Sequence, residues 1–148
     1  MSGALDHSPA TIIRQWMVNE SLATLPSAAG SWPASTAFMM DTPDNAIQVI
    51  SQAGLQYGRS HIDGEIEEHL GVQVIVRSAT HDAGYTKADA IKASMDTSSK
   101  LYTLTISSST YTIYAITRRG NVLDLGTEPT PTNRHLFSIN ATFSVRKE

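Results

Sequence analysis

The sequence contains no cysteine, which excludes disulfides, thiolate metal sites and cysteine nucleophiles. It also lacks long hydrophobic runs, and no window approaches the roughly 18 to 20 apolar residues that a membrane span requires. The first residues lack the basic and apolar regions of a signal peptide. We therefore expect a soluble protein that is made in the cytosol and has no membrane partner.

An excess of charge of one sign is lacking as well. The net charge is −3 and the pI is about 5.9, which argues against a broad nucleic-acid-binding surface. The sequence has no phosphate-binding loop, no GxGxxG and no GxSxG motif. Adjacent Glu67 and Glu68 would point to opposite faces of a strand, which is poor geometry for shared acid–base catalysis. We therefore expect no catalytic residue, no cofactor and no enzymatic activity.

Two strictly alternating segments are the clearest patterns that the sequence does contain. In the segment that follows Gly71, the valines at 72, 74 and 76 face one way, as in a strand covered on one face. A polar turn then leads into a helix that begins near His81 or Asp82, with Lys87 on its exposed side and a narrow core stripe of Ala88, Ile91 and Met95. The segment 136–146 repeats the alternation, and its apolar face consists of Phe137, Ile139, Ala141, Phe143 and Val145.

A first helix is predicted from the Ser8-Pro9 start, which supplies a cap and a proline in the first turn, to about Leu25. Trp16 lies on its widest apolar face and is predicted to be core. Leu22 points to another side, so either another subunit covers it or the last turn folds back onto the same core. Trp32, in the loop that follows, either covers the sheet edge or contacts a neighbour.

The remaining patterns complete the predicted fold. We expect a short strand at 37–40, a strand at 46–52, and a hairpin formed by 102–106 and 111–117. With 148 residues, of which 41% are hydrophobic, the chain can form one modest core and hence a single domain over 1–148. The order of elements predicts an α+β fold with a mixed, mostly antiparallel sheet and two helices packed on one face.

Two long polar arms, at about 55–70 and 118–135, interrupt this pattern. The first arm holds five candidate contact residues, which are His61, Asp63, Glu65, Glu67 and Glu68. Histidine and carboxylate are ligands for zinc or manganese, but their spacing here matches no recognised pattern. A solvated loop is therefore favoured over a metal site, and a loop that contacts a partner through its charge is the other alternative.

The second arm carries Arg118, Arg119 and Arg134. These arginines would make either a small basic edge or ordinary surface charge, and without interleaved aromatic residues they are a weak signal for nucleic acid. Connections of this length are usually functional or mobile. We therefore treat the three arginines as candidates for contact with a partner.

The order of these pieces resembles the tail terminator and minor capsid proteins of tailed bacteriophages, also called tail completion or neck proteins. The residues that carry the resemblance are Pro43-Asp44, the Gly71-Val72-Gln73 strand with Arg77, the helix with Tyr85, Ala88 and Ile91, and Arg134 before Phe137-Ser138-Ile139-Asn140. The resemblance covers nearly the whole chain, from Ser8 to Val145. Many relatives place a Pro-rich, acidic turn before the last strand, whereas the stretch here is longer and less regular.

This resemblance implies a structural virion protein, made in the host bacterium, that forms a ring, commonly six-fold, at the end of the tail tube. Its expected partners are further copies of itself, the tail tube protein and the head–tail connector. Genomic DNA would only pass through the lumen, which Asp63, Glu65, Glu67 and Glu68 could line so that phosphates are not trapped. The alternatives are another neck or head-completion adaptor, or a small metal-dependent enzyme that uses the His61–His69 loop.

Overall fold

The computed structural model describes residues 5–26, 31–55, 67–97 and 101–148. This part of the chain contains two helices, α1 (Pro9–Asn19) and α2 (His81–Thr97). It also contains seven strands, namely β1 (Ala34–Ser35), β2 (Ala46–Leu55), β3 (Glu67–Ser78), β4 (Tyr102–Ile106), β5 (Ser109–Arg118), β6 (Leu123–Thr127) and β7 (His135–Lys147).

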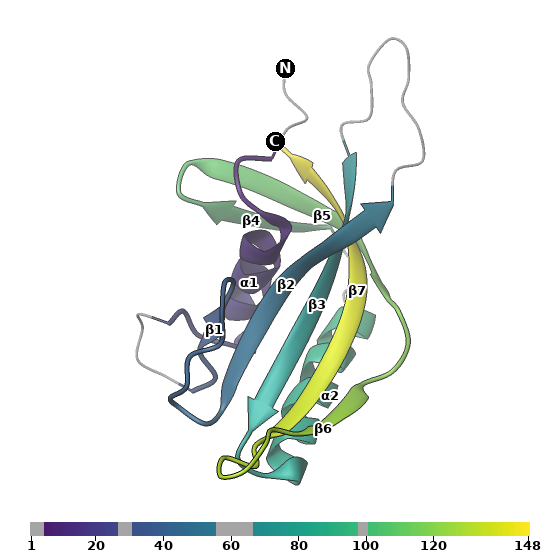
Figure 1. Cartoon of the computed structure of the whole chain (residues 1–148). Helices are drawn as coiled ribbons and strands as arrows, with labels where there is room; N and C mark the ends of the chain where they lie inside the picture. The colour runs from purple at the N-terminus through teal and green to yellow at the C-terminus, as the bar shows by residue number, and fades with distance from the viewer. Residues whose placement is uncertain (1–4, 27–30, 56–66, 98–100) are drawn as a thin grey trace.

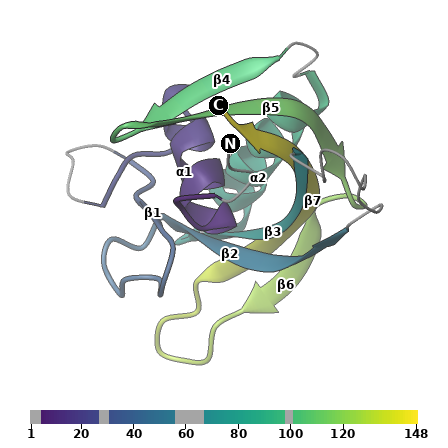
Figure 2. The ribbon, with the colours of Figure 1, turned by 90° about the horizontal axis from the view of Figure 1, so that it is seen from above.

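All seven strands belong to one sheet, with the order β1-β2-β3-β7-β5-β4 and with β6 added beside β7. Every neighbouring pair is antiparallel except β1 and β2, which run parallel. The sheet curls, and both helices lie within the curl against its concave face (Figures 1 and 2). The predicted α+β fold, with a mixed, mostly antiparallel sheet and two helices on one face, is confirmed.

β7 is the strand around which the sheet is built. One of its edges pairs with β3 along its length, and the other pairs with β6 near its start and with β5 near its end. The alternation predicted for this segment is confirmed, because the five apolar side chains at 137, 139, 141, 143 and 145 are fully buried. Trp16 of α1 packs edge-on against Phe143, with ring centroids 5.6 Å apart.

Helix α1 ends at Asn19, and the prediction that it continues to about Leu25 is wrong. Ser21 adopts a left-handed φ of 60°, which ends the helix. The Ser21 amide donates to the Val18 carbonyl and the Leu22 amide to the Met17 carbonyl, the bonding pattern of a Schellman motif. Leu22 then packs against the core. Leu22 therefore folds back onto the same core, and its coverage by another subunit stays a prediction.

The short strand expected at 37–40 is also misplaced, because the strand that forms is β1, three residues earlier. Its start is held by the amide of Ile47, which donates to the Pro33 carbonyl over 2.9 Å. Backbone carbonyls after β1 accept hydrogen bonds from side chains and do not continue the strand pairing. The Ser35 hydroxyl donates to the Phe38 carbonyl, and Arg77 donates to the carbonyl of Met40.

Both predicted arms are shorter than expected. β2 runs on to Leu55 and β3 begins at Glu67, so residues 67–70, which were predicted to belong to the first arm, form a strand opposite β7. The loop expected at 118–135 contains β6, which pairs along the edge of β7 next to β5. A bulge between Asp124 and Gly126 interrupts this pairing, and Gly126 supplies the required positive φ of 87°.

Gly84 marks a close approach of α2 to the sheet. A Cβ at this position would lie 2.7 Å from Cε2 of Phe137 and 2.9 Å from Cβ of Ser78. Glycine normally costs a helix about 0.5–1 kcal/mol relative to alanine, so its presence here reflects packing.

We predict that Gly84→Ala lowers the stability of the protein by about 1–3 kcal/mol, because overpacking outweighs the gain in helix propensity. Thermal unfolding followed by circular dichroism would measure the change. The control is Thr86→Ala, an exposed change in the same helix that also adds helix propensity, and its unfolding temperature should not fall. A stability of Gly84→Ala equal to that of the wild type would refute the close packing.

Candidate assembly surfaces

A buried arginine of β3 binds the turn formed by residues 40–45. Arg77 is 3% exposed, and its guanidinium donates only to backbone carbonyls. Nη2 lies 2.5 Å from the Met40 oxygen and 2.7 Å from the Pro43 oxygen, and Nε lies 3.0 Å from the Asp44 oxygen. Five N–H groups in a planar fork suit arginine to bind several carbonyls at once. Arg77 therefore determines the path of this turn.

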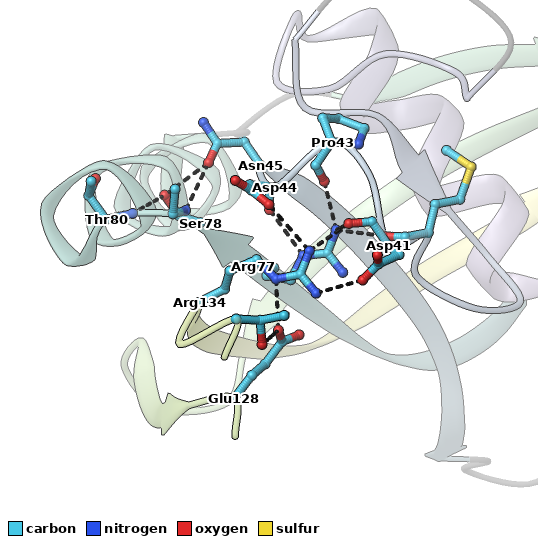
Figure 3. Close-up of polar contacts among 12 residues, drawn as sticks. Asp41, Pro43, Asp44, Asn45, Arg77, Ser78, Thr80, Glu128 and Arg134 are labelled. Atoms are coloured by element: carbon cyan, nitrogen blue, oxygen red, sulfur yellow. Dashed lines mark hydrogen bonds and ion pairs between the residues drawn. The ribbon is translucent and has the colours of Figure 1, made fainter. Parts of the chain in front are cut away.

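A second arginine, Arg134, reaches the same turn from the segment before β7 (Figure 3). Its Nη2 lies 3.0 Å from the Asp41 carboxylate, and Nη1 bonds the Asp41 carbonyl and lies 3.4 Å from Asp44. Nε donates to Glu128 over 2.7 Å. We call this set of Asp41, Asp44, Arg77, Glu128 and Arg134 the arginine clasp. It joins β3, the 40–45 turn and the segment between β6 and β7.

The electrostatics of the arginine clasp follow from these contacts. The hydrogen bond to Glu128, with further help from Asp41, outweighs burial and raises the pKa of Arg134. Burial would raise the pKa of Glu128, but hydrogen bonds from Arg134 and Thr132 outweigh it, so that pKa is lowered. Burial and the neighbouring Arg134 lower the pKa of Arg77, although a guanidinium stays charged at neutral pH. The ion pair of Arg134 with Glu128 therefore favours the charged form of both groups.

The 40–45 turn also positions the start of α2, through Asn45. The side-chain oxygen of Asn45 accepts from the Ser78 hydroxyl over 3.2 Å and from the Ala79 amide over 3.1 Å (Figure 3). The Ser78 hydroxyl in turn accepts from the Thr80 amide. Since Thr80 lies immediately before α2, the turn and the helix are linked through a continuous chain of hydrogen bonds.

The candidate residues of the first half fall into three groups. Trp16 is fully buried, as predicted for a core residue. Leu22 and Trp32 are half-buried and lie together at the end of α1. His61, Asp63 and Glu65 lie outside the described residues. For Glu67 and Glu68 the structure gives the backbone, which pairs with Arg146 and Val145 of β7.

The three arginines of the second arm do not share one surface environment. Arg118 pairs with Asp96 at the end of α2, with 3.0 Å between Nε and the carboxylate, and also bonds the Gly120 carbonyl. Arg119 is exposed. Arg134 is 7% exposed, and its charge is met by the carboxylates of the arginine clasp.

Within the described ranges, no group of three or more histidine or carboxylate side chains is placed to hold a metal ion. The histidine and carboxylates at 61, 63 and 65 lie outside these ranges. Neither of the helices described is both long and apolar enough to cross a membrane.

A groove, which we call the Trp32 groove, lies between the end of α1 and α2. Two of its lining residues, Leu22 and Trp32, had been singled out from the sequence. It encloses about 470 Å³ and its apolar lining includes Val18, Leu22, Ala23, Leu25 and Trp32. Lys87 of α2 crosses it, with Nζ 3.0 Å from the Leu22 carbonyl and 5.4 Å from the centre of the Trp32 ring. Lys87 was expected on the exposed side of the helix, but it is half-buried against Trp32. Burial lowers its pKa.

β6 provides a second surface of unusual character. All five of its residues are exposed, including Leu123 at 54% and Leu125 at 43%. Asp124 between them is fixed by the His81 ring, 3.3 Å away, and by the Gly126 amide, 2.8 Å away. Single exposed leucines are ordinary, but two on one exposed strand make β6 a candidate contact surface. Sequence reasoning missed this surface because it read the segment as a loop.

We predict that Glu128→Gln lowers stability at neutral pH by about 1–3 kcal/mol, because Arg134 loses a charged acceptor. The pKa of Glu128 is lowered by folding, so its contribution is present above its unfolded pKa and is lost as pH falls through its folded pKa. The difference between wild type and variant should therefore be constant near neutrality and shrink below about pH 4.3.

Urea unfolding of both proteins between acid and neutral pH would measure this difference. Glu20→Gln, which removes the same charge from an exposed residue at the end of α1, is the control and should show little difference at any pH. A difference between wild type and Glu128→Gln that persists unchanged in acid would contradict the ion pair with Arg134.

Comparison with known proteins agrees with these observations. A family described as "Bacteriophage tail terminator protein" matches residues 17–146. This region includes β1 to β7, α2, the arginine clasp and the Trp32 groove. No curated protein and no solved structure gives a significant match to the chain. Because the family match spans most of the sequence, the chain belongs to the bacteriophage tail terminator family and is a structural protein of the phage tail.

Proposed function

We propose that the protein forms a ring, with six subunits as the expected number, that caps the tail tube and joins it to the head connector. The family match over 17–146 is the observation that carries this proposal. A ring of identical subunits needs two different surfaces on each chain, one for each neighbour. The Trp32 groove and the exposed leucines of β6 are our candidates for these surfaces.

The lumen of this ring would let DNA pass without holding it. The net charge of −3 supports this role, since affinity for DNA arises mainly from cations that neutralise phosphates. Among the described residues, Arg77, Arg118 and Arg134 are engaged by carbonyls or carboxylates of the chain itself. The acidic residues of the first arm, Asp63, Glu65, Glu67 and Glu68, are proposed to face the lumen.

The remaining partners are two other components of the virion. One face of the ring would stop growth of the tail tube and the other would meet the connector. The polar segments at 118–135 and 55–70 are the proposed contacts, because they are the two long polar connections of the sequence. An adaptor that acts elsewhere in the neck would bind the connector but would not limit the length of tubes.

The decisive experiment mixes the purified protein with its tail tube protein and examines the products by light scattering and negative-stain microscopy. We expect rings, and tubes that carry a ring at one end and stop growing once it is present. A protein that remains monomeric both alone and with tube protein would refute the ring. Rings that bind connector but leave tube growth unchanged would place the protein elsewhere in the neck.

A further inference from the structure

The Trp32 groove holds a positive charge that no carboxylate of the described residues compensates. Lys87 donates a hydrogen bond to the Leu22 carbonyl over 3.0 Å, and its Nζ lies 5.4 Å from the centre of the Trp32 ring. Burial alone lowers its pKa, without a contribution from a nearby charge. A cation of this kind attracts a carboxylate or the negative face of a second aromatic ring. The groove is therefore complementary to an aromatic side chain that is accompanied by negative charge.

Phe38 is the most exposed large apolar side chain among the residues that the structure describes, at 70%. We call residues 37–41, which follow β1, the Phe38 segment. Its backbone is held in place, because the Ser35 hydroxyl donates to the Phe38 carbonyl over 2.6 Å and the Gln48 amide donates to the Ala37 carbonyl over 3.3 Å. An aromatic ring on a fixed backbone loses little conformational freedom when it binds. Phe38 therefore has the character of an interface anchor.

The Phe38 segment runs into the arginine clasp, which supplies the negative charge. The clasp contains three carboxylates, from Asp41, Asp44 and Glu128, for the two guanidinium groups of Arg77 and Arg134. Asp41 is the last residue of the segment, and its side chain stays 86% exposed while it binds Arg134. A carboxylate has about four acceptor sites, so this group can meet a further cation. The segment therefore combines an exposed aromatic ring with an excess of negative charge.

The Phe38 segment and the Trp32 groove lie on opposite sides of the sheet. Ile47 and Val49 of β2 are buried beneath the helices, so Gln48 between them points to the convex side, where it binds the segment. The groove is formed by the end of α1 and by α2, which lie on the concave side (Figure 2). A chain therefore cannot place Phe38 in its own groove. Contacts between unlike surfaces of identical chains generate rings when the rotation closes.

The exposed leucines of β6 are less suited to the groove than Phe38. Leu123 pairs with Ser138 and Asp124 with Phe137, so the two side chains face opposite sides of the sheet. Asp124 also contacts His81, in the first turn of the helix that lines the groove. β6 therefore cannot offer an apolar side chain and a carboxylate to one groove.

We propose that Phe38 of one subunit inserts into the Trp32 groove of the next, where its ring packs on the apolar lining beside Lys87. This inference rests on the ring proposed above and makes the Phe38 segment, in place of β6, the surface that meets the groove. The docked ring removes apolar area from water, which favours association. Attraction between the acidic segment and Lys87 orients the two subunits and disfavours other pairings.

The test compares two variants with matched controls. Phe38→Ala removes the ring, and Lys87→Glu reverses the charge in the groove. Leu101→Ala, which truncates another exposed apolar side chain, is the control for the first, and Lys92→Glu, on the same helix but outside the groove lining, is the control for the second. Assembly is measured by light scattering, with tail tube protein added if the wild type requires it. Thermal unfolding confirms that each variant is folded.

We expect Phe38→Ala and Lys87→Glu each to weaken assembly by roughly thirtyfold or more, as for a hot-spot residue, while both controls assemble as the wild type does. Assembly of the wild type should also shift the fluorescence of Trp32, the only tryptophan besides the fully buried Trp16. Should Lys87→Glu fail to fold, Lys87→Gln, which removes the charge but can still donate to the Leu22 carbonyl, replaces it.

Mixing the two test variants distinguishes this contact from any other. Lys87→Glu retains Phe38 and Phe38→Ala retains an intact groove, so one competent contact remains between unlike variants. At protein concentrations well above those at which the wild type assembles, the mixture should form a heterodimer that grows no further. A wild type that never assembles would refute the ring itself. Normal rings from either test variant, a mixture without heterodimer, or rings whose formation leaves the fluorescence of Trp32 unchanged would overturn the docking of Phe38 while the ring stands.

Discussion

The fold depends on the pairing of β7 with strands on both of its edges. One edge is filled by β3 and the other is divided between β6 and β5. Because side chains alternate along a strand, this pairing places five apolar residues toward the helices. Each large side chain that becomes fully buried contributes about 1.5–3 kcal/mol. A slip of one residue would move all of them to the convex face, so a single register is strongly favoured.

This constraint separates the scaffold from the assembly surfaces. The concave face is occupied by α1 and α2, and its apolar residues are used within the subunit. The surfaces that remain for contact with a neighbour include the groove at the end of α1 and the exposed strand β6. The surfaces proposed for assembly therefore lie outside the concave face of the sheet. Neither surface requires a change in the core.

The sequence predicted those elements whose pattern is local. The alternation of β3 and β7 and the stripe of α2 each lie within one segment, so the periodicity alone was sufficient. The end of α1 was missed because Ser21 adopts a left-handed conformation without glycine. β6 was missed because its partner lies in β7, beyond a connecting segment, 128–134, that contains two prolines. Lys87 was assigned to solvent because only the packing of Trp32 reveals that it is half-buried.

The arginine clasp has a consequence for local motion. Asp41, Thr42, Pro43 and Asp44 are exposed, and an exposed polar turn is ordinarily a site of fraying and of protease cleavage. Here the backbone carbonyls of the turn are bound by Arg77, and the carboxylates by Arg134. Opening the turn would remove the carbonyls that Arg77 binds and would leave Arg134 with Glu128. The amide hydrogens of the turn should therefore show the same free energy of opening in hydrogen exchange as those of the sheet, because both belong to one unfolding unit.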